Sequence, residues 1–100
     1  MSEIEWETKN HPVFLYMKGS PVMPQCGFSA RVAQILQHLG VQFASCNVLE
    51  DMEKREAIKV HAQWPTIPQL YVNGEFVGGC DIITEMFQTG ELQELLGVEG

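Results

Sequence analysis

The hydrophobic pattern in the first half of the chain predicts a strand followed by an amphipathic helix. Residues 13–17 (Val-Phe-Leu-Tyr-Met) form an uninterrupted apolar run, which is typical of a buried strand. The apolar positions that follow have helical spacing and lie at Phe28, Val32, Ile35, Leu36 and Leu39. Gly40 is a natural end for this helix. Cys26 therefore lies in the turn between a strand and the N-terminus of a helix.

The next segment predicts a second strand and a second helix. Residues 41–48 favour a strand, and residues 50–62 favour a polar, peripheral helix that Asp51 can cap. A strand, a crossover helix and a strand in this order form a right-handed unit, and its two strands are parallel.

A hairpin and two short helices complete the pattern. Asn73-Gly74 separates two apolar runs at residues 70–72 and 75–77, and both turn residues favour φ > 0, so this segment predicts a hairpin. Asp81 is expected to cap a helix over residues 82–88, which Gly90 ends. The last helical turns are expected at residues 91–96, with Leu92, Leu95 and Leu96 on one face.

The predicted order of elements, β-α-β-α-β-β-α, is a thioredoxin-like arrangement. We expect an α/β fold in which helices flank a four-stranded mixed sheet. The 100 residues are the size of one domain, so we expect a single domain over residues 1–100, with residues 1–10 as a short helix or a loose lead-in segment.

Charge and composition exclude several classes of protein. The formal net charge is −7, which argues against a general nucleic-acid binder. No window reaches the roughly 18 apolar residues of a membrane span. The acidic N-terminus has no apolar segment typical of a secretory signal and is not an Arg-rich transit peptide. We therefore expect a cytoplasmic protein, or a protein of an organelle matrix if a transit peptide was removed.

The basic residues are unevenly distributed along this acidic chain. Five of the six lie between residues 18 and 59, in the part of the chain that holds Cys26. They could form a local basic surface for a small anionic ligand, or simply a mixed, solvated surface.

The three cysteines point to thiol chemistry at one of them. Cys26, Cys46 and Cys80 show neither a disulfide pattern nor zinc-site spacing, and they suit a reducing compartment. A thiol at a helix N-terminus has a lowered pKa and reacts as thiolate. Ser29 stands where a Cys-x-x-Cys motif would have its second sulfur, and we expect it to be a first-turn residue without chemistry. A resolving thiol must then be a small molecule, another subunit or Cys80.

Three further segments are candidates for ligand binding. Lys18 follows the first strand and either holds a carboxylate and stabilises the thiolate or is a solvated turn residue. Pro68 is either a cis-proline that leaves the main chain of Ile67 free to pair with an extended peptide or part of a plain trans turn. Gly78-Gly79 precedes Cys80 and Asp81, whose amides could bind a carboxylate, with the Asp81 side chain binding an ammonium group or serving only as a cap.

These motifs together resemble a known family. The chain is similar to the monothiol glutaredoxins of the CGFS type over about residues 12–96. The resemblance rests on four motifs at the expected intervals, namely Lys18, Cys26-Gly27-Phe28-Ser29, Trp64-Pro65-Thr66-Ile67-Pro68 and Gly78-Gly79-Cys80-Asp81-Ile82.

The resemblance implies a thioredoxin fold and a glutathione site. Lys18 and Arg55 would bind the glycine carboxylate of glutathione. Ile67, held by Pro68, would pair with the cysteinyl backbone. Cys80 and Asp81 would hold the γ-glutamyl end, and Cys26 would be the reactive sulfur.

The resemblance also implies a 2Fe-2S cluster shared by two subunits, with one Cys26 from each chain and two glutathiones as ligands. The expected partners are a second copy of the chain when the cluster is bound, a BolA-like protein and apo iron-sulfur acceptors. Two alternatives remain. One is a glutathione-dependent thiol-disulfide oxidoreductase, at most a weak one because the loop before Cys26 is long. The other is a redox sensor in which Cys26 and Cys80 form a disulfide.

Overall fold

A four-stranded mixed sheet forms the centre of the molecule. The computed structural model describes residues 2–98 and contains strands β1 (Val13–Met17), β2 (Ala44–Asn47), β3 (Gln69–Val72) and β4 (Glu75–Gly78). The strand order is β2-β1-β3-β4, with β1 parallel to β2 and antiparallel to β3, and β3 antiparallel to β4. This is the thioredoxin-like arrangement that the sequence predicted.

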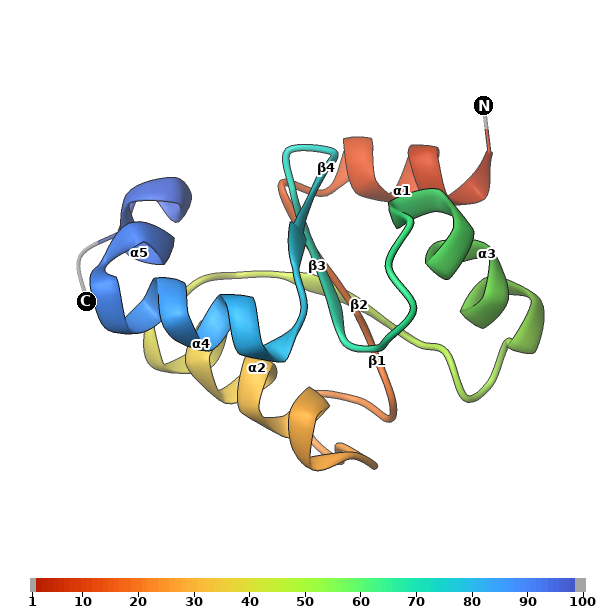
Figure 1. Ribbon diagram of the computed structural model, residues 1–100, viewed down its shortest axis with the longest axis horizontal. Coiled ribbons are helices and arrows are strands. Elements are labelled where there is room, and N and C mark those ends of the chain that lie inside the picture. Colours follow the sequence, from red (N-terminus) through yellow and green to blue (C-terminus); the bar gives the residue numbers. More distant parts are fainter. Residues whose placement is uncertain (1, 99–100) are drawn as a thin grey trace.

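Among residues 2–98, five helices cover the two faces of this sheet. They are α1 (Glu3–Asn10), α2 (Gly27–His38), α3 (Met52–Ala62), α4 (Cys80–Thr89) and α5 (Glu91–Leu96). Helices α2, α4 and α5 lie on one side of the sheet, and α1 and α3 lie on the other (Figure 1). Within the described residues, no helix is long and apolar enough to cross a membrane.

The sheet is buried on both faces because successive side chains of a strand point in opposite directions. On the side of α2, α4 and α5 they form a core that we call the aliphatic core: Val13, Leu15, Met17, Val32, Ala33, Ile35, Leu36, Leu39, Leu70, Val72, Ile83 and Leu92. On the side of α1 and α3 they form the aromatic core: Ile4, Phe14, Tyr16, Val48, Ile58, Ile67 and Tyr71. A strand buried on both faces has no polar alternation, which explains the uninterrupted apolar run in β1.

Local signals set most element boundaries as predicted. The carboxylate of Asp51 accepts a hydrogen bond from the Lys54 amide at 3.0 Å and caps α3. Asn73 and Gly74 have φ of 51° and 85°, as a two-residue hairpin turn requires. Gly90, with φ of 87°, separates α4 from α5.

Four details differ from the prediction. The second strand is shorter than residues 41–48, because Val41 and Phe43 pack against the aliphatic core before the strand begins. Helix α4 begins at Cys80 with Gly79 as its N-cap, so Asp81 lies in the first turn and is not the cap. Leu95 is 44% exposed and does not share the buried position of Leu92. Helix α3 is polar, but it is not merely peripheral, because two of its side chains, Lys54 and Ile58, are buried.

Candidate functional site

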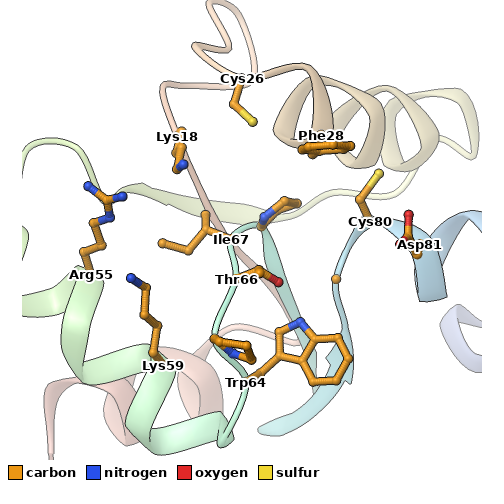
Figure 2. A pocket seen from close by; sticks show the side chains of 13 residues that line it. Lys18, Cys26, Phe28, Arg55, Lys59, Trp64, Thr66, Ile67, Cys80 and Asp81 are labelled. Carbon is orange, nitrogen blue, oxygen red and sulfur yellow. The ribbon is translucent and has the colours of Figure 1, made fainter.

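A groove of about 450 Å³ opens where both layers of helices meet the sheet. Its walls come from the end of β1, the start of α2, one side of α3, the segment before β3 and the start of α4 (Figure 2). The lining residues are Lys18, Cys26, Phe28, Arg55, Lys59, Trp64, Pro65, Thr66, Ile67, Pro68, Gly79, Cys80 and Asp81. All six residues predicted as ligand contacts lie here together with Cys26. Elements far apart in the sequence therefore form one site.

Cys26 is the N-cap residue of α2, and its sulfur faces the groove (Figure 2). Partial burial of the thiol acts to raise its pKa. The nearby amides of Ser29 and Phe28 and the positive charge of Lys18 favour the thiolate and outweigh burial, so the pKa of Cys26 is lowered. The sequence predicted this direction from the position of Cys26 at the helix N-terminus.

Ser29 has a larger role than the sequence suggested. The side chain is fully buried, and its hydroxyl oxygen accepts a hydrogen bond from the Lys18 amide at 3.0 Å. The same hydroxyl also helps lower the pKa of the Cys26 thiol. Ser29 lies in the first turn of α2, as predicted, and its side chain also joins this turn to the end of β1 and contributes to the lowered pKa of Cys26.

Three cations lie on one side of the groove. Lys18 comes from the end of β1, whereas Arg55 and Lys59 are one helical turn apart on α3 (Figure 2). The sequence placed Lys59 in the possible basic surface but did not predict it as a ligand contact, although its spacing of four residues from Arg55 puts both on one helix face. The other two basic residues of the 18–59 segment lie elsewhere, with Lys54 buried beneath α1 and Arg31 on the exposed side of α2. The basic surface is therefore real but smaller than composition suggested.

The floor of the groove is formed by the segment before β3. The Ile67–Pro68 peptide bond is cis, which settles the alternative that the sequence left open. Trp64 lies over Gly79, and a Cβ atom at Gly79 would come within 3.1 Å of the indole nitrogen and 3.2 Å of the Pro68 carbonyl oxygen. Glycine at this position therefore lets the indole pack on the main chain that leads into α4.

The opposite side of the groove is the N-terminus of α4. Cys80 and Asp81 occupy its first turn, where unpaired amides and the helix dipole favour an anion. Cys80 is partly buried, and its sulfur lies 3.9 Å from the Thr84 hydroxyl. The sulfurs of Cys26 and Cys80 both face the groove (Figure 2), and both are free thiols, so a disulfide between them stays a prediction.

In the part of the chain that the structure describes, Cys26 does not belong to a cluster of potential metal ligands. Within residues 2–98, no group of three or more His, Cys, Asp or Glu side chains could hold a metal ion. Cys46, the third cysteine, lies on β2, and burial raises the pKa of its thiol.

Comparison with known proteins decides the family. A family model described as glutaredoxin matches residues 13–77. An uncharacterized monothiol glutaredoxin, ycf64-like, of Synechocystis sp. is 59% identical over 86 residues, which are 86% of this chain and 80% of that protein. The chain belongs to the glutaredoxin family. A mitochondrial monothiol glutaredoxin-5 of Lachancea kluyveri is 57% identical over 96 residues, covering 93% of this chain and 67% of that protein.

The solved structures agree with the glutaredoxin assignment. The solution structure of reduced poplar apo GrxS14 has a TM-score of 0.84 and 48% sequence identity, and the match covers 94% of this chain and 86% of that one. The similarity to monothiol glutaredoxins agrees with Ser29 at the position of the second thiol. The family suggested by the sequence motifs is confirmed.

Proposed function

We propose that this glutaredoxin binds glutathione in the groove beside Cys26. Glutathione has a glycine carboxylate at one end and an α-amino acid group at the other. Lys18 and Arg55 on one side suit the carboxylate, and the α4 N-terminus with Asp81 on the other side suits the γ-glutamyl group (Figure 2). This placement of opposite charges at the two ends of one groove is the observation that carries the proposal.

The middle of the groove suits the peptide and its thiol. Ile67 and the cis Pro68 lie between the two charged ends, where the main chain of Ile67 can pair with an extended tripeptide. A volume of about 450 Å³ is within the usual range for small-ligand sites. The cysteinyl sulfur of the ligand would then lie beside Cys26.

We further propose that the protein carries a 2Fe-2S cluster as cargo. Such a cluster takes four ligands, usually thiolates. One chain offers Cys26 and one bound glutathione, so two chains and two glutathiones supply four sulfurs. Ligands that are half exogenous favour release of the cluster to an acceptor.

The surface around Cys26 supports docking of a second chain. Phe28 lines the groove with Cys26, and Val22 and Met23 come shortly before Cys26 in the chain; these three side chains are 62%, 89% and 67% exposed. Burial of such exposed apolar side chains favours association. We propose a second copy as the partner when the cluster is bound, and a BolA-like protein and apo iron-sulfur acceptors as partners in transfer. The chemistry needs a reducing compartment, either the cytoplasm or an organelle matrix.

Anaerobic reconstitution with iron, sulfide and glutathione tests the carrier function. We expect visible charge-transfer absorbance, two glutathiones per cluster and the elution volume of a dimer. Cys26→Ser should abolish the absorbance, whereas Cys46→Ser, a change of the same kind outside the groove, should retain it. A colourless wild-type protein after reconstitution would contradict the proposal.

The lowered pKa and open position of Cys26 also favour a second function as a glutathione-dependent oxidoreductase. The Cys26 thiolate would attack the glutathionyl sulfur of a mixed disulfide and release the substrate as a thiolate, which takes up a proton. A second glutathione thiolate would attack the same glutathionyl sulfur, forming oxidised glutathione and regenerating Cys26. A glutathione-reductase-coupled assay measures this turnover. We expect a low rate, and a rate like that of a dithiol glutaredoxin would make this the main function.

A further inference from the structure

Helix α3 carries two of the three cations of the groove, yet it has a small buried face. The buried side chains of α3 are those of Ile58, which is fully buried, and Lys54, which is 7% exposed. A buried lysine is rare because removal of its charge from water is costly unless a partner compensates. The partners of Lys54 are therefore central to how α3 is held.

Those partners lie on the N-terminal helix. The Lys54 ammonium donates hydrogen bonds to the carboxylates of Glu3 and Glu7, with 2.8 Å between its nitrogen and Glu7 Oε1. The same Glu7 oxygen accepts a hydrogen bond from the Tyr16 hydroxyl at 2.8 Å. One partly buried carboxylate thus joins α1, α3 and β1.

Arg55, the next residue on α3, has no comparable hydrogen bonds or ion pairs among the described residues. Its Nε atom is buried without a hydrogen-bond partner, and among residues 2–98 its guanidinium forms no ion pair. Lys59 differs, because its ammonium is 3.1 Å from a carboxylate oxygen of Glu56. The direction of the Arg55 guanidinium therefore depends on the placement of α3 itself.

We propose that Lys54 is a positioning residue for the carboxylate end of the groove. By holding α3 against α1 through Glu7, it sets how the Arg55 guanidinium meets the glycine carboxylate of the ligand. Helix α1, which lines no part of the groove, thereby contributes to binding. This inference rests on the proposed binding of glutathione.

The test compares two ligands that differ only at the carboxylate. Dissociation constants for glutathione and for its glycine ethyl ester are measured by calorimetry on the wild type, Lys54→Met and Glu7→Gln. We expect both variants to weaken glutathione binding roughly fivefold and ester binding less than about twofold. The reason is that a displaced Arg55 loses its charge-assisted contact with the glycine carboxylate, and the ester has no free carboxylate to make that contact. Lys9→Met removes the exposed Lys9–Glu5 pair of α1 and should change neither constant.

A double-mutant cycle shows whether Lys54 acts through Arg55. In an Arg55→Met background, Lys54→Met should have almost no further effect on glutathione binding, since coupled residues are not additive. Thermal unfolding and circular dichroism establish that each variant folds. Glu7→Gln, which keeps its side-chain volume, serves if Lys54→Met does not fold.

Two other outcomes would contradict the positioning role of Lys54 or the proposed function itself. Equal weakening of both ligands would show a general structural role and would overturn the inference, as would unchanged glutathione binding in folded variants. A wild type that fails to bind glutathione would instead overturn the proposed function, and the inference with it.

Discussion

The two sides of the sheet are built from different chemistry. The buried members of the aliphatic core are all apolar, and its helices pack through side chains such as Leu36 and Ile83. The aromatic core contains the hydroxyls of Tyr16 and Tyr71, which donate to Glu7 and Gln69, and Lys54 is buried at its edge. The first side is thus held mainly by apolar packing, whereas the second combines apolar packing with buried hydrogen bonds and an ion pair.

The groove lies where these two sides meet, and each side contributes different functional residues to it. Cys26 and Cys80 come from α2 and α4, the helices of the aliphatic core, whereas Arg55 and Lys59 come from α3. The sulfur is therefore placed by packing and by main-chain amides, and the cations are placed by a polar network. Mutations on the two sides should affect stability, pH dependence and ligand binding differently.

The largest effect on stability is expected in the aliphatic core. Leu36→Ala removes a fully buried side chain from α2, and we expect it to lower the free energy of unfolding by about 3 kcal/mol, because it loses burial and leaves a cavity. Chemical denaturation measures this change. Leu95→Ala, at a leucine that is 44% exposed, is the control and should cost less than about 0.5 kcal/mol. Equal losses in both variants would contradict the assignment of the core.

On the aromatic side we expect a smaller loss that depends on pH. Glu7→Gln weakens the hold on the buried ammonium of Lys54 and should cost about 2 kcal/mol near pH 7, less than a complete loss of partners, because Glu3 remains. Denaturant midpoints report the loss. Leu36→Ala should show the larger loss at neutral pH, without any change in the pH dependence of stability.

The sign of the pH dependence follows from the raised pKa values on this side. Burial acts to lower the pKa of Lys54, but its hydrogen bonds to Glu3 and Glu7 outweigh burial and raise it above 10.5. Burial raises the pKa of Tyr16 above 10.0 and that of Tyr71 to about 12. Above about pH 10 the unfolded chain therefore releases protons that the folded chain keeps, so stability falls as pH rises. Glu7→Gln should flatten this alkaline loss, and an unchanged slope would contradict the network.

Most of the fold was predictable because its signals are local. The apolar run of β1, the helical spacing of α2 and the Asn73-Gly74 turn each specify an element without distant information. The length of β2 was not predictable, since Val41 and Phe43 are apolar like strand residues but pack as a loop on the aliphatic core. The N-cap of α4 was misassigned to Asp81, because a glycine N-cap has no side chain to mark it.

The site residues were predictable where they belong to family motifs or lie at the N-terminus of a helix, where the helix dipole acts. The direction of the pKa shift of Cys26 followed from its position at a helix N-terminus. The positions of Lys54 and Lys59 could not be told apart from sequence, because which face of a polar helix is buried depends on what packs against it. Contact with α1, far away in the chain, places Lys54 inside and leaves Lys59 in the groove.

After Leu36→Ala and Glu7→Gln, a third substitution tests the hydrogen bond between Ser29 and the Lys18 amide on the aliphatic side. Ser29→Ala leaves the Lys18 amide without its buried acceptor and should lower the free energy of unfolding by about 1 kcal/mol. It also removes a hydroxyl that lowers the pKa of the Cys26 thiol, so this pKa should rise. Denaturation and thiolate absorbance measure the two effects. Ser45→Ala, at an exposed serine of β2, should change neither.

The smallest effect on stability is expected for Lys18→Met, which should change the free energy of unfolding by less than about 0.5 kcal/mol. Its effect should be on the sulfur. The charge of Lys18 lowers the pKa of Cys26, so its loss should shift the pH profile of iodoacetamide alkylation at Cys26 to higher pH. The measurement uses a Cys46→Ser, Cys80→Ser background, which isolates Cys26.

Lys54→Met in the same background separates the two sides of the groove. Lys54 pairs with Glu3 and Glu7 under α1, whereas the cation that lowers the pKa of Cys26 is Lys18, so this variant should leave the alkylation profile unchanged while it weakens glutathione binding. Lys18→Met should change both. If Lys54→Met shifted the alkylation profile as far as Lys18→Met does, the Cys26 thiol and the cations of α3 would be coupled. The view that the sulfur and the carboxylate-binding cations are positioned independently, from the two sides of the sheet, would then be wrong.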